Sequence, residues 1–208
     1  VVVVTVVLLT LYRLDWGLYI FLSAIFISDN FAIPGHDPWT ARLGYLITIN
    51  SIRPGLAVGY LTPMEIHLLF LIAVWILTIV ATKKLRFCPV SGAVPAALFF
   101  IWLLAAAVYG TSTGGDTLKA IWQIRSFLYL GILYVFVPQI VTTKEQVRNI
   151  LWVIIGTLSY KAGQAAMRYI NLGYSFGEHR ALAAHEDPIL LATVFLFLFC
   201  LIFLGGSP

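Results

Sequence analysis

The chain has few charged residues and almost no cysteine. Charged side chains make up 11% of its 208 residues, and only nine residues are acidic, whereas a soluble domain is usually about 25% charged. These charges are too few to cover a surface that faces water. The two cysteines, Cys88 and Cys200, lie far apart and form no CxxC pair, which excludes a disulfide framework and the common cysteine metal sites. We therefore expect no metal site at the cysteines.

Apolar runs, in contrast, are abundant. Hydrophobic residues make up 61% of the chain, with a mean hydropathy of +0.94, against about 45–50% in soluble domains. A helix that spans a bilayer needs about 20 mostly apolar residues. The runs close to that length are residues 64–81, 90–109, 120–141, 149–170 and 188–204. The first 28 residues are also apolar, but Arg13 and Asp15 interrupt them, so they form either two short helices or one long helix with an internal ion pair.

The predicted fold class is therefore all-α, a polytopic transmembrane helical bundle of about six spans, with seven as the alternative count. We expect residues 1–208 to form a single transmembrane helical domain that is incomplete at one or both ends, since apolar runs lie at each end of the chain. Residues 29–63 combine proline and glycine with several aromatic residues. That composition predicts an outward-facing re-entrant or interfacial segment.

The basic residues indicate the orientation. Lysine and arginine gather in cytoplasmic loops of membrane proteins, and residues 83–86 and 144–148 are the basic loops of this chain. Both loops should be cytoplasmic, and the less basic loops between them should face outward. The net charge of +4 is spread over loops and helix ends and does not form one stripe. We therefore expect no nucleic-acid partner.

Three cations interrupt the predicted spans: Arg125, Lys161 and Arg168. A charge at the centre of a membrane helix costs about 2.5–3.5 kcal/mol on insertion scales, so such residues indicate a functional site, here for an anion. Helix rise places all three in the outer half of the bilayer. Lys161, Gln164 and Arg168 share one helix face, whereas small residues around Gly163 predict a tightly packed second face. The alternatives are snorkelling to the headgroups for the arginines and a structural pair with a carboxylate for Lys161.

The last predicted outward loop, residues 175–188, adds Arg180, His179 and His185 close to the same leaflet. The spacing of the two histidines matches no common metal motif. A histidine here could transfer a proton, but a solvated loop of mixed charge is the favoured interpretation.

Three motifs carry a family resemblance. They are Arg125-Ser-Phe-Leu-Tyr-Leu-Gly-Ile-Leu-Tyr134 followed by the short charged loop 142–150, Leu61-Thr-Pro-Met-Glu65 at the start of a span, and Arg180 before another span. Over residues 61–204 the chain resembles the amino-terminal half of the O-antigen ligase and O-antigen polymerase family. The resemblance implies a multi-pass protein of the bacterial inner (cytoplasmic) membrane. It also implies a glycosyltransferase that moves a glycan from undecaprenyl pyrophosphate to an acceptor on the outward face, without a metal or nucleotide, so that no cofactor is expected.

The resemblance also suggests a binding site. Arg125 and Arg180 match arginines of that family that hold the pyrophosphate, and depth and helix face add Lys161 and Arg168. Gln164, His179 and His185 are candidates for polar support, and no catalytic residue is assigned. Membrane lipid and a lipid-linked glycan are the expected partners.

The family's large outward loop, with its histidine and arginine, follows the region of resemblance. We therefore expect residues 1–208 alone to be inactive as a transferase. Two other functions stay open: a non-catalytic transmembrane accessory subunit of a larger membrane complex, for example photosynthetic or respiratory, and an anion transporter.

Overall fold

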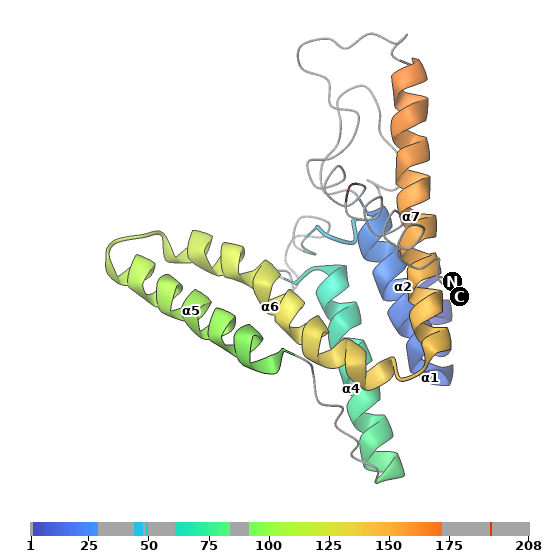
Figure 1. Ribbon diagram of the computed structural model, residues 1–208, viewed down its shortest axis with the longest axis horizontal. Helices are drawn as coiled ribbons and strands as arrows, with labels where there is room; N and C mark the ends of the chain where they lie inside the picture. Colours follow the sequence, from blue (N-terminus) through green and yellow to red (C-terminus); the bar gives the residue numbers. More distant parts are fainter. Residues whose placement is uncertain are drawn as a thin grey trace, which may run out of the picture. The chain divides into compact units, whose positions relative to one another are not determined.

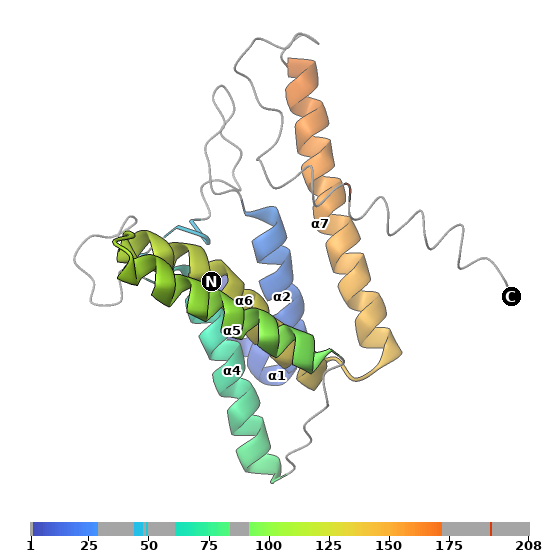
Figure 2. The same cartoon turned by 60° about the vertical axis from the view of Figure 1, so that its left-hand side comes forward.

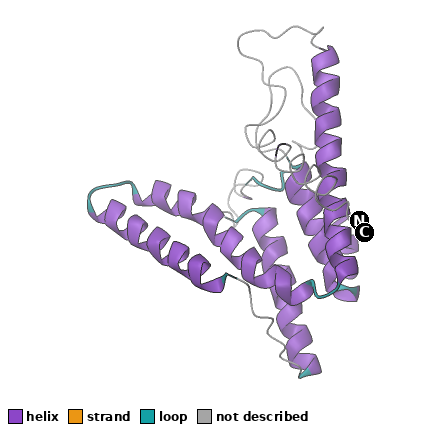
Figure 3. Cartoon of the chain, in the orientation of Figure 1, coloured by secondary structure: helices purple, strands orange, loops and turns teal. Residues whose placement is uncertain are grey.

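The computed structural model describes residues 2–28, 44–47, 49, 61–83, 92–171 and 192. The described residues form helices and short connections, without a strand among them. The helices, coloured along the chain in Figure 1 and by type in Figure 3, are α1 Val2–Tyr12, α2 Leu14–Ile27, α4 Pro63–Thr82, α5 Ala93–Ser112, α6 Thr117–Ile140 and α7 Lys144–Asn171. The predicted all-α class is confirmed for this part of the chain.

Three helices are long and apolar enough to cross a membrane: α4, α5 and the part of α6 from Lys119 to Ile140. They correspond to the predicted runs 64–81, 90–109 and 120–141. The run 149–170 lies within α7, which at 28 residues is about 42 Å long. This helix is long enough to cross a membrane but more polar than the three helices above. The run 188–204 lies outside the described residues. The number of six spans therefore stays a prediction.

The first 28 residues form two short helices, as one of the two sequence alternatives predicted. The helix breaks at Arg13, whose backbone is extended at φ −149° and ψ 118°. With 11 and 14 residues, α1 and α2 are each too short to cross a 30 Å hydrocarbon core. They fold back on each other as an antiparallel pair (Figure 1).

The described helices fall into two compact units, Val1–Trp75 with Glu145–Pro208 and Ile76–Lys144. In the first unit the core is made of leucine and phenylalanine side chains from α2, α4 and α7. They are no more than 2% exposed: Leu18, Phe21, Leu68, Leu71 and Leu158.

The start of α4 is closed by a capping box. The hydroxyl of Thr62 accepts the backbone N–H of Glu65 at 3.2 Å, and the Glu65 carboxylate accepts the backbone N–H of Thr62 at 2.6 Å. Pro63 is the first helical residue, where its missing N–H removes no hydrogen bond. Both capping side chains are buried. The sequence motif Thr62–Glu65 therefore has a local structural role in starting the helix.

The second unit contains an antiparallel hairpin of α5 and α6 (Figures 1 and 2). Phe100 lies against Gly131 so closely that a Cβ there would be 2.5 Å from its ring. The connecting turn includes Gly114 at φ +97°, a left-handed conformation that favours glycine. In the hairpin, the connecting turn lies at one end and the start of α5 lies at the other. This agrees with the expectation that successive loops lie on opposite sides of the membrane. No residue of α5 is buried, which is typical of a helix that faces lipid.

Candidate functional site

Lys161 is the most deeply placed cation among the described side chains of α7. It is 7% exposed, and its neighbours Thr157 and Leu158 on the same face are 7% and 2% exposed. The lysine lies about 25 Å along α7 from Lys144 and about 15 Å from Asn171. The sequence predicted that this cation faces protein or water and not lipid, and the structure buries it against protein; its role as a binding residue stays a prediction. A buried ammonium needs an anionic or hydrogen-bonding environment, so the face of Lys161 is the first candidate site.

The next predicted members of this face follow in α7. The Gln164 side chain is half-buried and donates from Nε2 to the Tyr160 hydroxyl at 2.8 Å. Arg168 lies two turns after Lys161 in the same helix, but its side chain is outside the described residues. Arg180, His179 and His185 also lie outside them. Their predicted roles in binding and polar support therefore stay predictions.

The small-residue face of α7 differs from its expectation. Ala162 and Ala166 are exposed, and a Cβ at Gly163 would meet nothing within 4 Å. Within the described residues, α7 packs through the face of Leu158 and Lys161. Lys161 follows Leu158 by three residues and so lies on the same face of the helix. Tight packing of the small face is not seen.

Arg125 lies on α6 in the second unit. The side chain is half-buried, and its Nε donates a hydrogen bond to the hydroxyl of Tyr129 one turn later. The helix begins at Thr117, three residues before the predicted run, which places Arg125 about 12 Å from its start. The phenol orients the guanidinium, whose planar fork suits phosphate oxygens. The cavity predicted to be shared by Arg125 and Lys161 stays a prediction.

A cavity of about 410 Å³ lies between α5 and α6 near their connecting turn. Lys119 and Asp116 line it, and their charged groups lie 3.5 Å apart. Arg125 is not one of its lining residues. Since an acid balances the base at this cavity, it is a poor candidate for an anion site.

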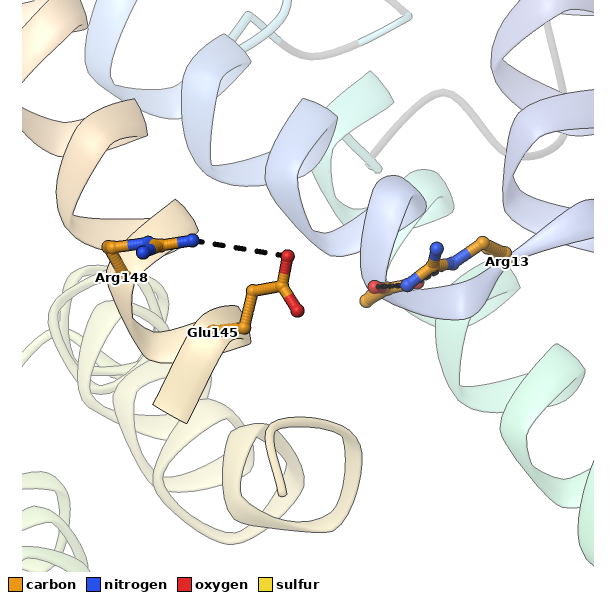
Figure 4. A network of polar contacts seen from close by, with 4 residues as sticks. Arg13, Glu145 and Arg148 are labelled. Atoms are coloured by element: carbon orange, nitrogen blue, oxygen red, sulfur yellow. Dashed lines mark hydrogen bonds and ion pairs between the residues drawn. The ribbon is translucent and has the colours of Figure 1, made fainter. Parts of the chain in front are cut away.

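A polar junction ties the start of α2 to the start of α7 within the first unit. Arg13 Nη2 lies 2.7 Å from Asp15 Oδ2, and the side chain of Gln146 also hydrogen-bonds to Asp15. Glu145 lies between Arg148 and this pair in Figure 4, with its Oε1 4.0 Å from the Arg148 Nη2 atom. The sequence predicted an ion pair of Arg13 and Asp15 only for one long helix; the structure shows the pair together with two short helices, and the link to α7 was not predicted.

The charge state of Asp15 follows from these contacts. Burial alone would raise the pKa of this carboxyl, but the hydrogen bonds from Arg13 and Gln146 and the charge of Arg13 outweigh burial and hold the pKa below its ordinary value. Arg13 is half-exposed, with 53% of its side chain accessible. Asp15 is therefore an ionised, structurally paired group at neutral pH, and it is not a free acid for catalysis.

A second site was not predicted from the sequence. The Tyr45 hydroxyl lies 2.8 Å from Nδ1 of His67, beside an apolar cavity in the first unit. No sequence pattern indicates this pair, because 22 residues separate Tyr45 from His67. Only the folded structure brings the two side chains together. Among the described residues, no group of three or more histidine, cysteine or acidic side chains could hold a metal ion.

Comparisons of the chain with family models, curated proteins and solved structures find no significant match. The candidate sites therefore rest on the residues described above and on the resemblance of the motifs.

Proposed function

We propose that the chain is the membrane-embedded part of an O-antigen-ligase-like glycosyltransferase and binds the diphosphate of an undecaprenyl-linked glycan. The proposal places it as a multi-pass protein of the bacterial inner membrane. One observation carries it: Lys161 is 7% exposed in the middle of a helix of 28 residues. Cations at such positions in membrane helices usually mark the path or site of an anionic ligand.

Arg125 supports the same chemistry. It lies within an apolar helix that can cross a membrane, and Tyr129 holds its guanidinium from one side. A guanidinium presents several N–H donors in a plane, so a side chain oriented in this way can bind two phosphate oxygens at once. In the proposal the planar fork of Arg125 binds phosphate oxygens of the diphosphate.

Binding of farnesyl diphosphate to the purified protein in nanodiscs tests the proposal. Arg125→Ala should weaken binding about 10- to 150-fold, the equivalent of about 1.5–3 kcal/mol for a hydrogen bond to a charged group. Arg125→Lys should recover only part of the affinity, since lysine lacks the planar fork. Lys161→Met should weaken binding while keeping the volume of the side chain.

Lys119→Ala is the matched control, because Lys119 is also a cation of this chain but its side chain is 82% exposed. Its affinity should equal that of the unsubstituted protein. Farnesol should compete poorly with farnesyl diphosphate, since it has the chain without the charge. Equal affinity for both probes, or full binding by folded Arg125→Ala, would contradict a diphosphate site.

The exposed small-residue face of α7 favours a second candidate function, a non-catalytic subunit of a larger membrane complex. Ala162, Gly163 and Ala166 present a surface on which another helix could approach closely, as small residues do in membrane helix pairs. For this function, Gly163→Leu should reduce the size of the complex extracted from native membranes. Met167→Leu, at a neighbouring exposed position, should not.

A further inference from the structure

A second cavity, of about 490 Å³, lies within the first unit. The first turns of α1, the end of α2 and the first turns of α4 form its wall, together with Tyr45 and Ile49. The cavity therefore lies at the opposite end of the α1–α2 pair from Arg13. Its volume is in the range of pockets that hold small ligands, about 300–1,000 Å³.

The chemistry of the wall limits what could bind there. Most lining side chains are aliphatic or aromatic, as illustrated by Val6, Ile20, Ala24, Ile66 and Phe70, and no charged residue is found among the described residues of the wall. A phosphate or carboxylate would lose its hydration here without gaining a counter-charge. The cavity therefore suits an uncharged, mostly apolar molecule, which a membrane supplies at high local concentration.

Two residues of this wall each carry a buried polar atom. Ser28 Oγ and His67 Nε2 are both buried and have no hydrogen-bond partner within the described part of the chain, and both residues line the cavity. A buried polar group without a partner costs free energy, and native proteins contain few of them. Two such groups in the wall of one cavity indicate that a further molecule supplies their partners.

The contacts of His67 indicate which hydrogen bond is missing. Its Nδ1 lies 2.8 Å from the Tyr45 hydroxyl, and the edge of the Phe21 ring packs against it with centroids 5.4 Å apart. Burial raises the pKa of Tyr45, so the phenol keeps its proton and can donate it to Nδ1. In the tautomer in which Nδ1 accepts this hydrogen bond, the neutral imidazole carries its proton at Nε2, and the unpartnered atom is then a donor.

We propose that this cavity binds an uncharged membrane-soluble molecule whose apolar chain lies along the aliphatic wall and whose carbonyl oxygen accepts hydrogen bonds from Ser28 and His67. Acyl ester lipids and prenylated quinones share this chemistry. Both polar atoms are closed to solvent, so the head group enters as the serine hydroxyl and the imidazole turn toward it. Neither Arg125 nor Lys161 is one of the lining residues of this cavity, and the inference does not depend on the proposed function.

Two probes distinguish the sources of the ligand: decylubiquinone for a quinone head and dioleoylglycerol for an acyl ester. Each is titrated into the delipidated, purified protein in detergent, with binding followed by native mass spectrometry. At least one should bind saturably. The infrared carbonyl band of that probe should move to lower wavenumber when bound, because the oxygen accepts hydrogen bonds.

Variants then locate the site. His67→Phe should weaken binding about 2- to 12-fold, the equivalent of one uncharged hydrogen bond, and should reverse part of the infrared shift. Ser28→Ala should have a similar effect. Ala24→Phe should fill the cavity and abolish binding, and Val3→Phe, at an exposed position of the cavity wall, is a milder block that leaves the helix core unchanged.

Ala162→Phe is the matched control, since it adds the same side chain at an exposed position of α7 away from the cavity. It should bind like the unsubstituted protein. The proposal is overturned if neither probe binds saturably, if both Ala24→Phe and Val3→Phe bind normally, or if the infrared shift survives in His67→Phe combined with Ser28→Ala. Loss of farnesyl diphosphate binding in Arg125→Ala, in contrast, tests only the diphosphate site.

Discussion

Gly17 of α2 lies against Thr10 of α1 so closely that a Cβ at Gly17 would be 2.6 Å from the Thr10 hydroxyl oxygen. The same Cβ would be 2.8 Å from a methyl carbon of Leu71 in α4. Three helices therefore meet at a position that only glycine fits without movement of its neighbours. This contact closes the α1–α2 pair and sets its distance from α4.

Substitution at this contact should destabilise the protein. Gly17→Val should cost about 1–3 kcal/mol, the usual range for added atoms in a packed core, because Thr10 is β-branched and held within its own helix. Gly163→Val is the control, since a Cβ at Gly163 meets nothing within 4 Å. The unfolding midpoints of both variants are measured by heating the protein in detergent and recording the fraction that stays monodisperse. Equal midpoints for the two variants would contradict the close approach.

Arg13 and Asp15 should respond unequally to substitution. The Arg13 side chain is 53% exposed and can turn to water, whereas that of Asp15 is only 7% exposed. Arg13→Gln leaves a buried carboxylate short of a partner and should lower the unfolding midpoint clearly, while Asp15→Asn should have a smaller effect. The double variant should be more stable than Arg13→Gln alone. The same unfolding assay checks all three, and the reverse order of the single variants would argue against the pairing.

The ion pair should also give a stability that depends on pH. The pKa of Asp15 is lower in the folded protein than its ordinary value near 3.9, so its contribution is complete above about pH 4 and is lost as the pH falls through the folded value. Unfolding midpoints measured between pH 7 and pH 3 should fall at the acid end. Asp15→Asn should flatten that fall, and an identical pH profile in the variant would show that other carboxyls cause it.

The polar junction and the α5–α6 hairpin together predict which positions share a side of the membrane. Asp15 is hydrogen-bonded to Gln146, so single cysteines at Tyr12 and Thr143 should be on the same side, and Thr113, in the opposite turn of the hairpin, should be on the other. The cysteines are introduced with Cys88 and Cys200 replaced by serine. An impermeant maleimide added to intact cells should label only Thr113→Cys. Labelling at Thr143 without labelling at Thr113 would invert the orientation.

The capping box of α4 gives a local stability test. Thr62→Ala removes the hydroxyl that accepts the Glu65 N–H and should cost about 0.5–2 kcal/mol. Thr62→Ser keeps that oxygen and should stay close to the unsubstituted protein. Urea unfolding in detergent, with helix content followed by circular dichroism, measures the difference. Equal losses in both variants would assign the effect to the methyl group of Thr62.

The sequence by itself determined the all-α class and the positions of four helices. Apolar runs of about 20 residues have few structures open to them in lipid, since each backbone N–H and C=O must be bonded within the segment. The interruption at Arg13 and Asp15 was also visible, because two charged residues stand within an otherwise apolar run. The motif of Thr62 and Glu65 can also be recognised in the sequence as a capping box, because its hydrogen bonds are local.

Only the tertiary structure decided which faces pack and which polar groups meet. Helical periodicity showed that Lys161 and Gly163 lie on different faces of α7, but not that the face of Lys161 is the buried one. Likewise, no local pattern joins Asp15 to Gln146 or Tyr45 to His67, and Ser28 and His67 share a cavity wall only through the folding of α2 against α4. Such contacts depend on which side chains fill the space between helices, and that is a property of the whole assembly of helices, not of any one segment.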